Sequence, residues 1–83
     1  MEGMAPPRPM RLIRAERGLS MQGLSDRSGC SVKTILDVEL GRRVPTQRTV
    51  RRLAESLEVP LGEVHEFRMA VDRWSRYRKT GRQ

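Results

Sequence analysis

The stretch GLSMQGLSDRSGCSVKTILDVELGRRVP, residues 18–45, predicts two short helices joined by a tight turn. Ser20 and Ser31 each stand where a helix would begin, and a serine hydroxyl there accepts a hydrogen bond from a free backbone N–H one turn on. Gly29 follows the first helix, and glycine readily takes the left-handed conformation in which many helices end. We therefore expect helices over residues 21–28 and 32–40.

Two short helices this close together are typical of a helix-turn-helix, whose second helix enters a DNA major groove. The order of residues also resembles the Cro/lambda-repressor-like (xenobiotic-response-element) family of helix-turn-helix proteins. The resemblance covers about residues 10–68 and implies an all-α, five-helix lambda-repressor-like DNA-binding domain, here with an extended C-terminal helix. The segments that carry it are RAERGLS at 14–20, LSxxSGCS at 24–31, IxxVExGRRxP at 35–45 and LAESLEVP at 53–60.

The composition limits the kind of partner. The 83 residues hold 17 Lys and Arg against 10 Asp and Glu, a formal net charge of +7, and this excess favours a polyanionic partner. Much of the excess lies between Phe67 and Gln83, so composition alone does not point to the second helix of the motif. A chain of this length forms one small domain with a modest core.

Several classes of protein are disfavoured. No apolar run reaches the roughly 18 residues of a membrane span, and the N-terminus lacks the layout of a signal peptide. We therefore expect a cytoplasmic protein without a membrane partner, at the bacterial nucleoid or encoded by a phage. One cysteine excludes an internal disulfide framework. Since there is no Cys/His cluster, phosphate loop or nucleophile with a base, we expect no enzyme, catalytic residue, metal or cofactor.

Three segments are predicted along the chain. Residues 1–9 contain three prolines and few large apolar side chains, which predicts a disordered arm. Residues 10–68 would form the helix-turn-helix domain, and residues 69–83 a basic helical extension and tail. Further helices are expected over residues 10–17, 47–58 and 61–79, with Leu12, Ile13 and Ala15 of the first and Val50, Leu53, Ala54 and Leu57 of the fourth facing the core.

The second helix of the motif carries the predicted base contacts. Ile35 and Val38 face inward at i, i+3 spacing, which leaves an outward face that matches the base-reading face of the family. Lysine can donate to guanine, aspartate can accept from the cytosine amino group, and apolar side chains can contact thymine methyl groups. The predicted base-contacting residues are Val32, Lys33, Leu36 and Asp37. In the competing interpretation, Val32 and Leu36 contact a protein instead.

Phosphate contacts are expected around this helix. The resemblance implies one at the start of the first motif helix, where the family usually has glutamine; here Met21 takes that position and Gln22 follows it. Adjacent arginines after the second helix are well placed for phosphates beside the groove. The predicted phosphate-contacting residues are Met21, Gln22, Arg42, Arg43, Thr46 and Arg48, with Thr46 also the N-cap of the fourth helix.

The resemblance also implies a structural ion pair between Arg14 and Glu39. A planar guanidinium can bind a carboxylate through two hydrogen bonds. Such a pair would tie the first helix to the end of the recognition helix and fix its angle.

The last predicted helix is longer than the core of one domain needs. Its second half is expected to pack on the same helix of a second copy through Val71, Trp74 and Tyr77. A two-fold homodimer would present two recognition helices about 34 Å apart, which matches half-sites in successive major grooves. The alternative is a monomer with a basic tail.

These features together favour a sequence-specific regulator of transcription that binds double-stranded DNA as a dimeric repressor of phage, plasmid or antitoxin type. Two alternatives stay open. One is a protein-interaction module built on the helix-turn-helix fold, whose protein partner would bind Val32 and Leu36. The other is non-specific nucleic-acid binding by the basic tail, with Trp74 and Tyr77 stacking on single-stranded bases.

Overall fold

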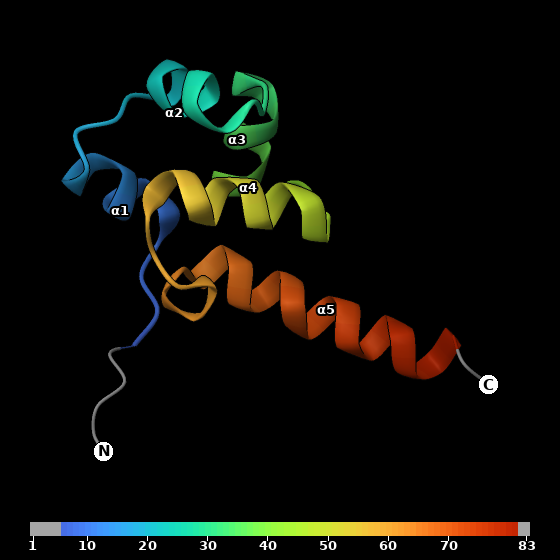
Figure 1. The fold of residues 1–83 in the computed structure, drawn as a ribbon. Helices are drawn as coiled ribbons and strands as arrows, with labels where there is room; N and C mark the ends of the chain where they lie inside the picture. The colour runs from blue at the N-terminus through green and yellow to red at the C-terminus, as the bar shows by residue number, and fades with distance from the viewer. Residues whose placement is uncertain (1–5, 82–83) are drawn as a thin grey trace.

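The computed structural model describes the backbone of residues 6–81 and the side chains of residues 6–76. Within that part the chain is helical, and β-structure is limited to one isolated bridge (Figure 1). The expected all-α class with five helices is confirmed. The elements are α1 (Met10–Glu16), α2 (Met21–Ser28), α3 (Val32–Glu39), α4 (Gln47–Leu57), the 3-10 turn η1 (Leu61–Glu63) and α5 (His65–Gly81).

Hydroxyl side chains cap the N-termini of α2, α3 and α4. Ser20 Oγ accepts a hydrogen bond from Gly23 N at 2.9 Å, and Ser31 Oγ accepts one from Thr34 N at 3.1 Å. Thr46 caps α4 in the same way. Each bond satisfies a backbone donor that has no acceptor inside its own helix. The starts of α2, α3 and α4 are therefore those predicted from the sequence.

The turn of the motif depends on Gly29. Its φ of 78° is left-handed, a conformation that costs glycine little. Its N–H donates to Ser25 O at 2.9 Å and ends α2, so that α3 can begin at Val32. This short turn holds the two motif helices against each other.

The helix α4 lies in the middle of the fold, with α2 and α3 on one side and α5 on the other (Figure 1). Its predicted inward stripe is buried, and so are the predicted inward residues of α2 and α3. Cys30 in the turn also packs in this core. The buried apolar residues are Met10, Ile13, Leu24, Cys30, Ile35, Val38, Val50, Leu53, Ala54, Leu57, Val64, Phe67 and Ala70.

The buried face of α1 differs from the prediction. Met10 and Ile13 are fully buried, whereas Leu12 is 44% exposed and Ala15 is also exposed. The expectation that Leu12 and Ala15 face the core is wrong, because the short helix buries only one i, i+3 stripe.

The segment before α1 is joined to the start of α5. Arg8 N donates to Glu63 O at 3.0 Å, and His65 N donates to Arg8 O at 2.8 Å, which forms a parallel bridge between Arg8 and Val64. The expectation of disorder is wrong for Arg8, because its backbone has specific partners far along the chain. Residues 1–5 of the predicted arm lie outside the described residues.

The last helix begins later than predicted. Val64 has φ −108° and ψ 120°, an extended conformation that separates η1 from α5. The single helix expected from residue 61 is therefore divided, because Val64 adopts the extended geometry of its bridge to Arg8. In the described part of the chain, no helix has both the length and the apolar content to cross a membrane.

Candidate nucleic-acid interface

The helix α3 presents a mixed surface with one cation. The Lys33 side chain is 78% exposed, and Val32 and Leu36 are half-buried. Leu40, one turn after Leu36, is 55% exposed, although the sequence reasoning did not select it. The i, i+4 relation to Leu36 was the signal that could have found it.

Asp37 does not lie on the outward face as predicted. The residue is only 5% exposed, so the prediction that its carboxylate lies open on the outward face is wrong. Lys33 Nζ lies 3.4 Å from Asp37 Oδ2, and Arg42 Nη1 lies 3.8 Å from Oδ1. Arg43 Nε lies 4.0 Å from Oδ2. The carboxylate is the common partner of three cations.

The loop after α3 is joined to the helix through the same aspartate. Arg42 N donates to Asp37 O at 2.9 Å, a bond that closes the C-terminal turn of α3. The side chains of Arg42 and Arg43 remain 62% and 65% exposed. Three of the predicted DNA-contacting cations thus gather around one buried carboxylate.

The recognition helix is braced by α1. Arg14 Nε donates to Glu39 Oε2 at 2.7 Å, and Arg14 Nη2 donates to Glu39 Oε1 at 3.2 Å. The two side chains are 16% and 5% exposed. Arg14 Nη1 also donates to Leu19 O at 3.0 Å. The guanidinium therefore joins α1, the chain leading into α2, and the end of α3.

The start of α2 offers less to a phosphate than its predicted residues imply. The partly buried side chain of Met21 packs against the core, and a thioether has no hydrogen-bond donor, so the group at this position that suits a phosphate is the backbone N–H of the helix terminus. Gln22 is exposed, and its Nε2 donates to Asp26 Oδ1 at 2.9 Å. At the start of α4, Thr46 and Arg48 are both exposed, with the Thr46 hydroxyl engaged as the cap.

Trp74 packs on its own chain. Its ring lies against the hydrophobic core, and its Nε1 donates to Pro45 O at 3.1 Å. The second half of the last helix is expected to pack on a second copy, whereas Trp74 makes these contacts within its own chain. Val71 is 39% exposed, as a surface contact requires, and the Tyr77 side chain lies outside the described residues.

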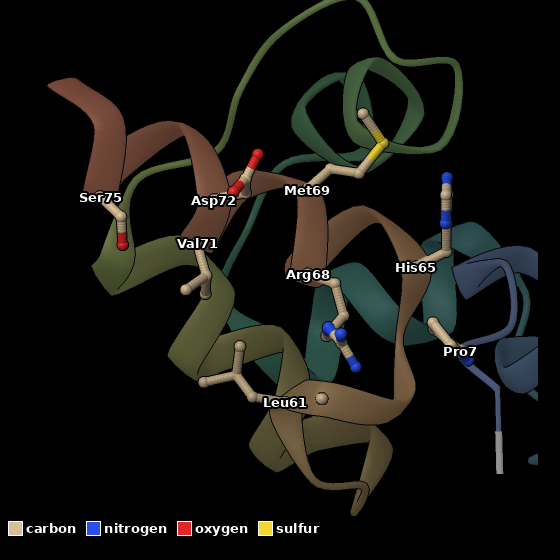
Figure 2. A pocket seen from close by; sticks show the side chains of 9 residues that line it. Pro7, Leu61, His65, Arg68, Met69, Val71, Asp72 and Ser75 are labelled. Carbon is tan, nitrogen blue, oxygen red and sulfur yellow. The ribbon is translucent and has the colours of Figure 1, made fainter. Parts of the chain in front are cut away.

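An open hollow of about 650 Å³ runs along the outer side of α5 (Figure 2). Apolar and charged side chains alternate around it, and Met69 at its edge is 54% exposed. Arg68 and Asp72, which are one turn apart on α5, both line it. Its lining comprises Pro7, Leu61, Gly62, His65, Arg68, Met69, Val71, Asp72 and Ser75.

The described residues contain no group of three or more His, Cys, Asp or Glu side chains placed to hold a metal ion. The charged groups gathered near α3 are cations around a single carboxylate. Their chemistry suits the binding of phosphates and base edges.

Comparison with known families agrees with this geometry. A helix-turn-helix family model matches residues 10–64, more than half of the chain. The chain belongs to the Cro/C1-type helix-turn-helix family. The resemblance seen in the sequence is confirmed.

The chain is also similar to a curated protein, the HTH-type transcriptional repressor RghR of Bacillus subtilis strain 168. The two are 37% identical over 70 residues, which cover 71% of this chain and 52% of the relative. This helix-turn-helix protein thus spans about half the length of the curated relative that it matches. No solved structure matches the chain significantly.

Proposed function

We propose that this helix-turn-helix protein is a sequence-specific, dimeric repressor that places α3 in the major groove of double-stranded DNA. The observation that carries the proposal is the group of exposed cations, Lys33, Arg42 and Arg43, at the recognition helix and the loop after it. That helix is braced by the nearly buried pair of Arg14 and Glu39. A braced helix with exposed cations at its surface suits major-groove recognition.

The parts of the interface would have separate tasks. Lys33 would donate to guanine, while Val32 and Leu36 would contact thymine methyl groups. Arg42, Arg43 and Arg48 would bind phosphates on either side of the groove, together with Gln22, Thr46 and the N-terminus of α2 at Met21. Phosphate contacts position the domain, whereas base contacts specify its site.

Repression is supported by the printed name of the curated relative, which is a transcriptional repressor. A regulator that covers an operator by binding needs no catalytic group, metal or cofactor, and we assign none. The phage, plasmid or antitoxin kind of repressor remains our interpretation. In this role the protein would act at the nucleoid, in the bacterial cytoplasm.

The hollow on α5 supports a dimer. Arg68 and Asp72 both line this hollow, and they stand two residues before and two residues after Ala70 in the sequence. Asp72 pairs with Arg76 of its own helix at 2.6 Å. If a second α5 lies antiparallel across this surface, each Arg68 also faces the partner's aspartate, so the charges are self-complementary about a two-fold axis. Met69 and Val71 would supply apolar contact area. Val71 thus stays a dimer contact, whereas Trp74 does not.

In vitro selection from random duplex DNA at about 150 mM salt tests the proposal, because weak phosphate-only binding is reduced there. We expect an enriched inverted repeat with half-site centres about 10 base pairs apart. A single enriched half-site would support sequence recognition and contradict the dimer. No enrichment would contradict the proposal and favour a protein partner at Val32 and Leu36.

A double variant, Arg42→Ala with Arg43→Ala, separates DNA binding by α3 from binding by the basic C-terminal tail. The double variant should lose most duplex binding if these two arginines bind the DNA phosphates beside α3. Unchanged binding by this variant would instead assign the binding to the tail.

A further inference from the structure

Asp37 lies at the face that would bind DNA under the proposed function, on which its role here rests. Asp37 is nearly buried, and Lys33, Arg42 and Arg43 lie 3.4, 3.8 and 4.0 Å from its carboxylate oxygens. All three cations are side chains that DNA phosphates or base edges would engage. The carboxylate therefore occupies, in the free protein, the place of an anionic ligand of these cations.

The contacts of the three cations with the Asp37 carboxylate are weak enough to be exchanged for contacts with DNA. Only Lys33 is close enough to hydrogen-bond the carboxylate, at 3.4 Å, and the two arginines are held at longer range. All three cationic side chains are 62% to 78% exposed, so they can turn toward a phosphate at little cost in packing. The Asp37 side chain is 7% exposed, and it belongs to a helix whose end is held by Arg14 and Glu39, so it cannot follow them.

We propose that Asp37 is a built-in competitor of DNA that suppresses binding to non-cognate sequences. When the three cations move to phosphates, the carboxylate loses counter-ions and comes close to a polyanion, and both changes disfavour the complex. This penalty applies to every duplex. It is offset only where a base pair presents a hydrogen-bond donor, such as the cytosine amino group, to the carboxylate that the departing cations uncover.

The fold of α3 does not depend on the charge of the Asp37 carboxylate, so its effect would fall on DNA specificity. Helix α3 already has its cap at Ser31 and its brace at Glu39, and the bond that closes its last turn uses the Asp37 backbone carbonyl, which every residue has. Removing the charge of Asp37 should therefore leave the helix in place. What changes is the competition between one internal carboxylate and the external phosphates.

The test compares Asp37→Asn with the unmodified chain on a random-sequence duplex, by fluorescence anisotropy from about 50 to 200 mM salt. We expect the variant to bind the random duplex about tenfold more tightly. The preference for the selected operator over random duplex should fall.

The matched control is Glu63→Gln, which removes one negative charge from exposed η1 without touching α3. It should bind random duplex as the unmodified chain does. An equal gain from Glu63→Gln would mean that only net charge matters and would overturn the proposal. Unchanged or weaker binding of random duplex by Asp37→Asn would overturn it as well.

If Asp37→Asn fails to fold, the pair Asp37→Glu and Asp37→Gln keeps the test, because the two side chains have the same length and differ in charge. The proposal expects tighter random binding for the glutamine variant than for the glutamate variant, and equal binding would overturn it. If neither the unmodified protein nor any Asp37 variant binds duplex DNA at about 50 mM salt, the proposed function itself fails. Duplex binding without an effect at Asp37 overturns only the competitor role.

Discussion

Trp74 on α5 is hydrogen-bonded to the loop that leads from the recognition helix into α4, with Nε1 donating to Pro45 O at 3.1 Å. The bond joins the C-terminal helix to the side of the domain that carries Arg42 and Arg43. Because Pro45 is buried and the Trp74 ring packs on the core, the loop is held at the end farther from α3. The position of this loop therefore depends on α5.

Trp74→Phe should destabilise the fold by about 1 kcal/mol, because the buried carbonyl of Pro45 loses its donor. Urea unfolding measures the effect, which should not vary with protein concentration if the bond is made within one chain. Leu12→Ala, at an exposed apolar residue, should change stability by less than about 0.5 kcal/mol. A loss that disappears on dilution would assign Trp74 to an interface between copies instead.

Arg14→Ala should lower the free energy of unfolding by about 3 kcal/mol, because Glu39 is then left nearly buried and unpaired. Chemical denaturation followed by circular dichroism measures it. Arg8→Ala is the control, since the pair of Arg8 and Glu16 is exposed, and should cost less than about 1 kcal/mol. Similar losses for the two variants would contradict the bracing role of Arg14.

Glu66 supplies the acceptor at the start of α1, which Pro9 does not. Met10 N donates to Glu66 Oε1 at 2.8 Å. Glu66→Ala should therefore cost about 1 kcal/mol of stability, as the loss of a helix cap does. Glu66→Gln keeps an acceptor oxygen and should cost less, and thermal unfolding can rank the two. The prediction fails if the exposed change Glu63→Gln costs as much as Glu66→Ala.

Lys33 and Arg48 should affect DNA binding differently. Lys33→Ala should weaken binding to the selected operator by about 1–3 kcal/mol and relax the preference at one base pair. Arg48→Ala should weaken binding to all duplexes alike and reduce the salt slope by about 0.9. Titrations of operator and random duplex at several salt concentrations separate the two effects. The assignment of base and phosphate contacts is wrong if both variants behave alike.

The proposed dimer can be tested by exchanging charges on α5. Arg68→Asp should place two acids opposite each other across the antiparallel helices, and the same variant combined with Asp72→Arg should restore the opposite charges. Sedimentation should show dissociation for the single variant and recovery for the double variant. A chain that stays monomeric without any substitution would rule out this interface.

Local sequence was sufficient for the helices of the motif. The caps at Ser20, Ser31 and Thr46 and the left-handed Gly29 act within one or two turns, so residue type and spacing predicted where α2, α3 and α4 begin. The inward stripe of α4 followed from helical periodicity for the same reason. Where the last helix and the segment before α1 departed from prediction, the cause was the bridge between Arg8 and Val64, which are distant in the chain.

The candidate site also has features that local sequence determined and features that depend on contacts between distant residues. By itself the sequence determined the family, the helix-turn-helix, and the chemistry available on α3, because these depend on residue order and local geometry. Only the tertiary structure decided that Asp37 is nearly buried among Lys33, Arg42 and Arg43. Only the tertiary structure likewise revealed the hydrogen bond from Trp74 to Pro45 and the bridge between Arg8 and Val64. Helical periodicity assigns a residue to a face, but the neighbours that cover that face come from other elements, whose approach local spacing does not encode.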